Sequence, residues 1–232
     1  MRDRADGSPY QLKRFKYNSH DRILRWLSGA KVPSRILDVG AADGYLGAIL
    51  KRWGHFVVGV ENDPVSAARA RGHYDEFHVA DVEEFAFPCR YEFDYILFAD
   101  VLEHLREPAA VLKKSLPSLK ANGQIILSVP NLANIAMRLS LLAGRFEYAD
   151  RGIMDRTHLR FFTLSTLKKT LNDCGLDIAE LAASPLPVQL VWPLTDAKWF
   201  APLHELHYML VRMRKPLFAY QFIARARRRG AS

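Results

Sequence analysis

Cysteine is scarce in this chain, and its two cysteines form no recognisable pattern. Cys89 and Cys174 stand far apart in a sequence of 232 residues. Disulfide-stabilised secreted domains and cysteine-based zinc sites both require several closely spaced cysteines. The sequence therefore excludes those two classes and predicts a reduced, cytoplasmic setting.

Long hydrophobic runs are also missing. No apolar stretch approaches the roughly 18 residues that a membrane-spanning helix needs, and residues 1–16 lack the apolar centre of a secretory leader. Hydrophobic residues still make up 49% of the chain and charged residues 25%, a balance typical of a globular protein with a sizeable core. We expect a flexible arm over 1–16 and a single folded domain over 17–232.

Acidic residues are in deficit. The 33 lysines and arginines exceed the 25 aspartates and glutamates, which gives a formal net charge of +8. Such an excess can attract nucleic acid or an anionic membrane surface. Here much of it lies near the two ends, and no aromatic residues are interleaved with it as in single-strand binding platforms. We therefore expect solvated ends and no nucleic-acid partner.

Short apolar runs alternate with amphipathic segments along most of the chain. The expected strands are 35–39, 55–61, 76–80, 93–99, 123–129, 176–183 and a last one in which Phe218, Tyr220 and Phe222 alternate. The expected helices are 17–28, 44–53, 63–72, 108–121, 132–143, 163–174 and 196–214. Apolar strands separated by helices indicate a mostly parallel sheet with helices on both faces. The predicted fold class is α/β, Rossmann-like and doubly wound, with seven strands.

Two segments, 131–162 and 185–215, depart from this alternation. We expect them to be insertions that form a helical lid and select the substrate. Candidates for the acceptor pocket in the first segment are Arg145, Phe146, Tyr148, Arg151 and Arg156. The helix in the second segment has an apolar stripe at helical spacing, which we expect to pack over the sheet. Contact with a membrane surface or a second subunit is the alternative for this stripe.

A glycine-bearing turn follows the first expected strand. Strand, glycine turn and helix together bring bare backbone up to a nucleotide-like ligand. This turn carries two carboxylates, since Asp38 precedes Gly40 and Asp43 lies within the loop. Phosphate sites use exposed N–H groups and a positive helix end, so these carboxylates disfavour a pyrophosphate. A nucleoside with positive charge fits better, and S-adenosylmethionine, with its sulfonium and ammonium groups, is the obvious one.

Acidic residues also mark the ends of the next three strands. Glu61, Asp81 and Asp100 stand where those strands end, and ligands of open α/β sheets lie beyond these carboxyl ends. An acid at the position of Glu61 can accept hydrogen bonds from ribose hydroxyls. Read from Ala42, the loop also imitates a dinucleotide-binding pattern that ends at Gly47. An NAD-dependent oxidoreductase therefore remains an alternative.

Four segments carry a resemblance to a known family. They are Ile-Leu-Asp-Val-Gly-Ala-Ala-Asp-Gly, Val-Val-Gly-Val-Glu-Asn-Asp, Phe-Asp-Tyr-Ile-Leu-Phe-Ala-Asp-Val-Leu-Glu-His-Leu and Gly-Gln-Ile-Ile-Leu-Ser-Val-Pro-Asn. From about Tyr17 to the last strand, the chain resembles class I S-adenosylmethionine-dependent methyltransferases, in the broad group that includes the ubiquinone-pathway O-methyltransferases. One departure is Ala42, where the family usually has glycine. We expect the loop to sit slightly farther from the ligand and binding to survive.

The resemblance implies a set of cofactor-binding residues. Asp38 and Gly40 would hold the methionine end, Glu61 the ribose, and Asp81 with Val82 the adenine. The full set of candidates is Asp38, Gly40, Ala41, Asp43, Gly44, Glu61, Asn62, Asp81, Val82, Ala99 and Asp100.

A second group of side chains could bind a metal or move a proton. Asp100, Glu103 and His104 have the spacing that places them on one face if the segment is helical. With His158 from the loop downstream, they could hold a divalent cation such as Mg²⁺, which would lower the pKa of a substrate hydroxyl. The group resembles the metal site of small-RNA 2′-O-methyltransferases and of the ubiquinone O-methyltransferases. A loop-orienting role for the histidines, with no metal, is the alternative.

Either histidine of this group could act as a general base, because an imidazole can accept a hydroxyl proton near neutral pH. We prefer His158, since its loop is expected to close the substrate side. A hydrogen-bonded structural histidine is the competing interpretation.

The sequence thus predicts a methyltransferase that acts on a hydroxyl of a small molecule or glycan. Residues 144–148 and 155–163 resemble bacterial methyltransferases of cell-surface glycan and secondary-metabolite pathways, which favours a sugar hydroxyl. Besides the oxidoreductase, the alternatives are an RNA 2′-O-methyltransferase and a non-catalytic partner that keeps the cofactor pocket.

Overall fold

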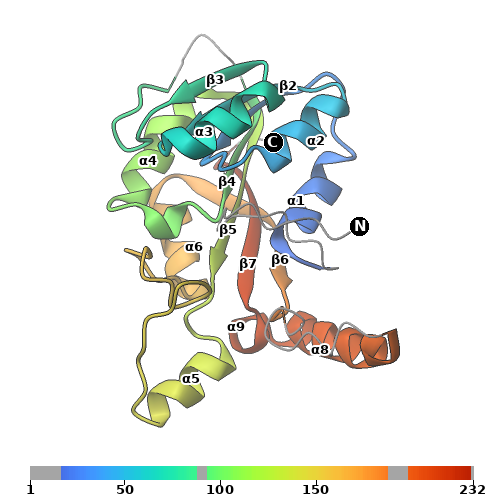
Figure 1. The fold of residues 1–232 in the computed structure, drawn as a ribbon, viewed down its shortest axis with the longest axis vertical. Helices are drawn as coiled ribbons and strands as arrows, with labels where there is room; N and C mark the ends of the chain where they lie inside the picture. Colours follow the sequence, from blue (N-terminus) through green and yellow to red (C-terminus); the bar gives the residue numbers. More distant parts are fainter. Residues whose placement is uncertain (1–16, 88–92, 188–197, 231–232) are drawn as a thin grey trace.

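A seven-stranded sheet runs through the centre of the molecule (Figure 1). The structure is a computed structural model that describes residues 17–87, 93–187 and 198–230. The strands are β1 (Arg35–Val39), β2 (Phe56–Glu61), β3 (Glu76–Val79), β4 (Phe93–Ala99), β5 (Leu119–Pro130), β6 (Leu176–Ser184) and β7 (Gln221–Arg228). The expected arm over 1–16 lies outside the described residues.

The order of the strands is β3-β2-β1-β4-β5-β7-β6. Strands β1 to β5 pair in parallel, and β7 lies antiparallel between β5 and β6. The predicted α/β, mostly parallel fold of the Rossmann-like class is confirmed. Because the chain order reverses beside β1, the carboxyl ends of β1 and β4 form the edge at which such sheets bind ligands.

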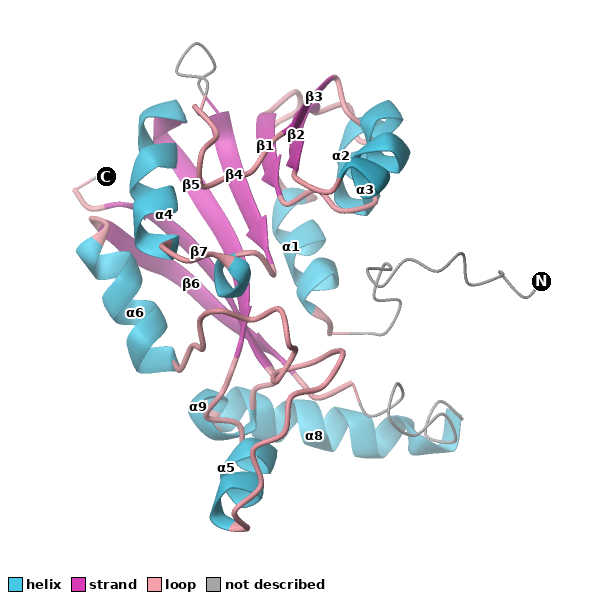
Figure 2. Ribbon diagram, turned by 60° about the vertical axis from the view of Figure 1, so that its left-hand side comes forward, coloured by secondary structure: helices cyan, strands magenta, loops and turns pink. Residues whose placement is uncertain are grey.

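Helices cover both faces of the sheet (Figure 2). The described helices of the chain are α1 (Ser19–Leu27), α2 (Tyr45–Arg52), α3 (Pro64–Ala70), α4 (Pro108–Ser115), α5 (Ile135–Leu142), α6 (Leu164–Asp173), α8 (Ala201–Met213) and α9 (Lys215–Phe218). Apolar residues of α4 and α6 join one core cluster with Leu37 and Val39, whereas those of α1 and α2 join another with Ile36. Neighbouring residues of β1 thus point to opposite faces, as the pleat of a strand requires.

Several predicted boundaries are wrong. The helix expected over 108–121 ends at Ser115, because Pro117 falls in the following 3-10 turn and β5 begins at Leu119. The last strand begins at Gln221, and Phe218 belongs to α9. The burial of β7 changes along the strand, because Gln221 to Ala224 are buried whereas Arg225, Arg227 and Arg228 are partly or fully exposed, so no single pattern marks its start.

Two helices extend beyond the carboxyl edge of the sheet (Figures 1 and 2). Helix α5 contains no buried residue, and Leu142 at its end is 84% exposed. In α8, Val211 is fully buried while Leu203, Met209 and Met213 remain exposed. Among the described helices, none is long and apolar enough to cross a membrane.

Candidate active site

A cleft of about 860 Å³ opens at the carboxyl ends of β1, β2, β3 and β4. Most candidate cofactor residues line it, namely Asp38, Gly40, Ala41, Glu61, Asn62, Asp81, Val82, Ala99 and Asp100. Its size falls within the roughly 300–1,000 Å³ range of small-molecule and cofactor sites. The topology thus brings together side chains that lie more than sixty positions apart in the sequence.

The turn after β1 is built around Gly40. Its φ of 70° is left-handed, and the amides of Gly40 and Ala41 donate to the carbonyl of Val60 at 2.9 and 3.0 Å. A Cβ at this position would lie 2.6 Å from Cγ2 of Val101. Glycine is therefore required both by the backbone conformation and by the close approach of the neighbouring loop.

Ala42, the departure from the family pattern, also has a left-handed φ, of 45°. Its amide donates to Oε2 of Glu61 at 2.8 Å, so a hydrogen bond to the end of β2 holds it in this conformation. Glycine adopts such a φ without the steric cost that alanine incurs. The local backbone thus explains why glycine is usual at this position.

Exchanging the two residue types at these positions should have opposite effects. Ala42→Gly should leave stability unchanged or raise it by up to about 1 kcal/mol, because relief of strain competes with added chain entropy. Gly40→Ala should cost on the order of 2 kcal/mol or more through strain and the contact with Val101. Urea unfolding of both variants measures the difference, and equal stabilities would contradict this account of the turn.

Asp38 is almost fully buried beneath this turn, with 2% of its surface exposed. The hydroxyl of Tyr74 donates to its carboxylate at 2.7 Å. Burial raises the pKa of Asp38 to about 7, although the Tyr74 hydrogen bond opposes the rise and the nearby Glu61 adds to it. Because its pKa is about 7, this buried carboxyl can lose its proton when a cationic ligand binds beside it.

Glu61 presents an anchored carboxylate at the end of β2. Its Oε2 accepts from the amide of Ala42, and its Oε1 accepts from the amides of Asn62 and Asp63, both at 2.9 Å. A carboxylate has about four acceptor sites. Three backbone donors therefore fix its orientation and leave capacity for a ligand hydroxyl.

Two candidates in the same loop lie off the described cleft. Asp43 is buried and forms an ion pair with Arg69, at 2.8 Å from both Nε and Nη2. Gly44, with φ of 81°, is the N-cap that precedes α2. Neither residue is part of the cleft lining, whereas Arg69 is. The negative charge expected from Asp43 is thus largely balanced by an arginine.

Three side chains of types that can bind a metal converge beside the cleft, and His104 is the one of them that lines it. Glu103, His104 and His158 each offer a ligand atom, and these atoms lie within 4.8 Å of one another. The expected helical face is wrong, because Leu102–His104 forms a 3-10 turn and Asp100 precedes it with a left-handed φ of 59°. Asp100 instead accepts a hydrogen bond from Nε2 of Gln221 at 2.8 Å. In the described part of the chain, it lies outside this three-residue group.

The two histidines of the group differ in position. His104 lines the cleft, whereas the buried His158 does not, and their ring centroids are 4.9 Å apart. Nδ1 of His158 lies 3.0 Å from the carbonyl of Ile153, so it carries the proton and Nε2 is left as the acceptor. Burial lowers the pKa of His158, and the neighbouring His104 lowers it further. His158 is therefore neutral near pH 7.

The expected acceptor residues of the first insertion lie elsewhere. Described residues at 145, 146, 148, 151 and 156 are exposed and are not part of the cleft lining. From this insertion, Thr157 and Leu159 line the cleft instead. The sequence also missed His20, Tyr45 and Arg106, which line the cleft without any local pattern that marks them.

Comparison with known proteins identifies the chain. Residues 10–181 match the family model described as the methyltransferase domain. The chain belongs to this family of methyltransferases. S-adenosylmethionine is the cofactor of this methyltransferase, and the acidic cleft at the switch point of its sheet suits that cation. The NAD-dependent oxidoreductase is thereby ruled out.

Its relatives include methyltransferases of named function. It is 29% identical over 198 residues to the ubiquinone biosynthesis O-methyltransferase of Azorhizobium caulinodans, with 80% of this chain and 76% of that protein covered. It is 32% identical over 173 residues to the protein of the same name from Bradyrhizobium diazoefficiens, with 71% and 65% covered. Among solved structures, the magnesium protoporphyrin IX methyltransferase from Synechocystis PCC 6803 with bound SAH matches with a TM-score of 0.61 at 18% identity, covering 90% and 81%.

Proposed function

We propose that this methyltransferase transfers the methyl group of S-adenosylmethionine to a hydroxyl group of a small molecule, with a sugar hydroxyl as the preferred acceptor. The observation that carries the proposal is the group of Glu103, His104 and His158, of which His104 lines the cofactor cleft. Transfer to oxygen requires the removal of a hydroxyl proton, and this group supplies acceptors for it. Relatives named O-methyltransferases support the same chemistry.

The cofactor would lie along the carboxyl ends of the strands. Asp38 and the Gly40 turn would face its cationic methionine end, Glu61 its ribose hydroxyls, and Asp81 with Val82 its adenine. Asp81 is exposed, and its side chain already accepts from the amide of Glu83 at 2.9 Å. The remaining lining candidates, Ala41, Asn62, Ala99 and Asp100, would complete the walls, while Asp43 and Gly44 would act through the shape of the loop.

Methyl transfer makes modest demands on the protein. In-line attack needs the acceptor oxygen aligned with the methyl carbon, water kept out and one proton removed. Of the two histidines in this group, His104 is the one that lines the cleft, so it would meet the acceptor hydroxyl. His158 does not line the cleft, so it would act indirectly, through the contact of its ring with the His104 ring. This assignment reverses the preference for His158 that the sequence suggested.

The same group could hold a divalent cation. Two imidazoles and one carboxylate suit zinc, manganese, iron or cobalt, whereas Mg²⁺ prefers oxygen ligands. Asp100, which is engaged by Gln221, would not be a ligand. A cation bound here would lower the pKa of an acceptor hydroxyl. The donor set therefore fits a transition-metal ion better than the expected Mg²⁺.

The charge of the cleft favours a small acceptor over RNA. Its described lining contains six carboxylates, Asp38, Glu61, Asp63, Asp81, Glu83 and Asp100, against two arginines, Arg69 and Arg106. A nucleic-acid backbone requires cationic partners for its phosphates. A neutral hydroxyl compound meets no such repulsion.

The proposal is tested by incubating the purified protein with S-adenosylmethionine and three sets of acceptors. These are monosaccharides and their nucleotide conjugates, catechols and other phenols, and short RNA. Mass spectrometry should detect a product heavier by one methyl group, together with S-adenosylhomocysteine, in the sugar set. Methylation of RNA alone would overturn the proposal, and methylation of phenols alone would refute the preference for sugars.

Glu61→Gln should weaken cofactor binding by about 1–3 kcal/mol, which is a factor of roughly 5 to 150. The glutamine NH₂ group would replace one carboxylate oxygen of Glu61 and cannot accept a hydrogen bond from a backbone amide. Either the Ala42 loop or the Asn62 turn would therefore lose its hydrogen bond to this side chain. Calorimetry with S-adenosylmethionine measures the loss. Glu84→Gln, at an exposed position outside the described cleft lining, is the matched control, and similar affinities for the two variants would contradict the placement of the ribose.

A further inference from the structure

A second cavity, of about 400 Å³, lies between α1, β6 and the α8–α9 segment. Its lining shares no described residue with the cofactor cleft. Three cationic side chains meet there from three helices, Arg22 of α1, Arg212 of α8 and Lys215 of α9. We call this cavity the cationic pocket.

The charge of the cationic pocket is not balanced by its surroundings. Among described residues, no carboxylate forms an ion pair with Arg22, Arg212 or Lys215. The one acid of the lining, Glu180, accepts from Nε1 of Trp26 at 2.8 Å and from Nη2 of Arg225 at 2.9 Å. Its charge is therefore engaged by Trp26 of α1 and Arg225 of β7, and the three cations repel one another unless an anion joins them.

Helix dipoles do not explain this placement. A basic residue at the end of α8, such as Arg212, is favoured by the partial negative charge of that helix terminus. Arg22, however, lies in the first half of α1, where the partial charge is positive. Arg22 therefore joins Arg212 and Lys215 in the pocket lining against the preference of its own helix.

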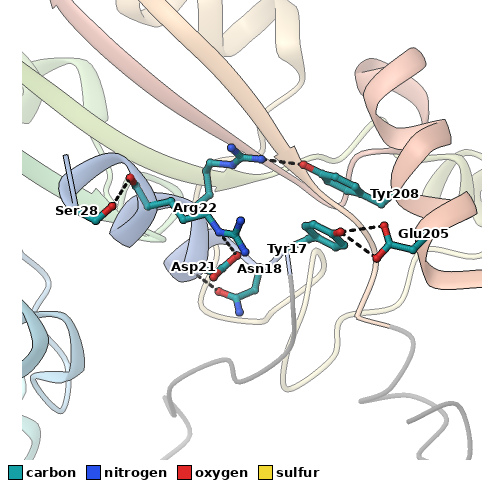
Figure 3. Close-up of polar contacts among 8 residues, drawn as sticks. Tyr17, Asn18, Asp21, Arg22, Ser28, Glu205 and Tyr208 are labelled. Carbon is teal, nitrogen blue, oxygen red and sulfur yellow. Dashed lines mark hydrogen bonds and ion pairs between the residues drawn. The ribbon is translucent and has the colours of Figure 1, made fainter. Parts of the chain in front are cut away.

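The pocket is held in shape by an aromatic clasp, the stacked rings of Tyr17 and Tyr208 (Figure 3). The ring centroids are 3.8 Å apart and the planes 7° from parallel, and the Tyr17 hydroxyl donates to Glu205 of α8 at 2.9 Å. Arg22 reaches across to the Tyr208 hydroxyl, to which its Nη2 donates at 2.8 Å (Figure 3). The phenol oxygen is used as an acceptor, so its proton remains available to a ligand.

We propose that the cationic pocket binds a phosphate ester. Two guanidinium groups, an ammonium group and a phenol supply several donors from different directions, which matches the charge and the oxygens of a phosphoryl group. The phosphate belongs either to a small soluble ester or to the headgroup of an anionic lipid. The exposed apolar side chains of α8, including Met209 and Met213, lie on the helix that carries Arg212 and would contact the chain of such a lipid.

Titration of the full chain with glycerol 3-phosphate, followed by calorimetry in phosphate-free buffer, tests the soluble source. Arg212→Glu and Lys215→Glu should each weaken binding by about tenfold or more. Arg214→Glu makes the same charge change at an exposed position between them, outside the described pocket lining, and should change binding less than twofold. Unchanged affinity for S-adenosylmethionine would show that all three variants are folded.

Sedimentation with vesicles tests the lipid source. Phosphatidylglycerol vesicles should bind the protein and phosphatidylcholine vesicles should not, with the same dependence on Arg212 and Lys215. Binding of glycerol 3-phosphate assigns the pocket to a soluble ester, and binding of the vesicles alone assigns it to a lipid headgroup. Equal losses in the Arg214→Glu variant, or no saturable binding of either probe, would overturn the proposal. Methyl transfer is not a readout, so these outcomes are independent of the proposed acceptor.

Discussion

Replacing Asp38 by asparagine should weaken the binding of S-adenosylmethionine by roughly a hundredfold, an effect of about 3 kcal/mol. The Asp38 carboxyl is buried beneath the Gly40 turn and would face the cationic end of the cofactor. Asparagine keeps the shape and can still accept the hydrogen bond of Tyr74. The loss of affinity would therefore measure the effect of the missing negative charge, because the structure of the site is retained.

The same change should make the cofactor-free protein more stable above pH 7. The pKa of Asp38 is about 7 in the folded protein, against 3.8 for an unperturbed aspartate. Between these values the folded state holds a proton that the unfolded chain has lost, so the contribution of this group to stability falls as the pH rises and is gone above 7. Asparagine does not titrate, and a shift of about three pKa units corresponds to a gain on the order of 2–4 kcal/mol at pH 8.

Calorimetry and urea unfolding between pH 5 and 8 measure both effects. Wild-type affinity should fall as the pH drops below 7, by up to about tenfold per unit, because cofactor binding must displace the Asp38 proton. The Asp38→Asn variant should lack this component. Asp177→Asn, at an exposed position on β6, is the control. A variant that binds as tightly as the wild type would refute the placement of the cationic end of the cofactor.

His104→Ala should reduce the turnover number by about a hundredfold or more, which is the range of a lost general acid–base group. Cofactor affinity should change less than twofold, since His104 is not among the residues proposed to hold the methionine end, the ribose or the adenine of the cofactor. His73→Ala, an exposed histidine outside the described cleft lining, should retain full activity. Single-turnover kinetics with the acceptor found in the screen would separate chemistry from product release.

Metal analysis of the same variants distinguishes the two roles proposed for this group. If Glu103, His104 and His158 hold a cation, a chelator should abolish turnover, zinc or cobalt should restore it, and His158→Ala should lose the bound metal. If His104 acts alone as the base, chelation should change nothing and His158→Ala should keep most activity. Full activity of His104→Ala would remove the group from the mechanism.

Much of the fold followed from local patterns. The apolar runs of β1, β2 and β4 predicted buried parallel strands, because strands covered on both faces are continuously apolar. The predicted edge of acidic residues also rests on a local signal, the residue type at each strand end. Signals failed where the burial pattern changes along one strand, as at β7, and where proline ends a helix, as at Pro117.

The candidate site could be assembled from the sequence only in part. Spacing alone suggested that Asp100, Glu103 and His104 share a helical face, but a left-handed φ at Asp100 sends its side chain to Gln221 instead. The approach of His158 to His104 depends on how a loop fifty positions downstream packs on the 3-10 turn. Side-chain direction after an irregular turn is set by such packing, and no pattern of residue types encodes it.

The order of residues was enough to specify a parallel sheet, its glycine turn and a cationic nucleoside as ligand, because each of these depends on neighbours along the chain. Packing between distant segments decided the burial and the pairing of the charged side chains. It buried Asp38 against Tyr74, paired Asp43 with Arg69, and gathered Arg22, Arg212 and Lys215 around one cavity. Electrostatic energy depends on distance and burial in space, and those quantities exist only once the chain has folded.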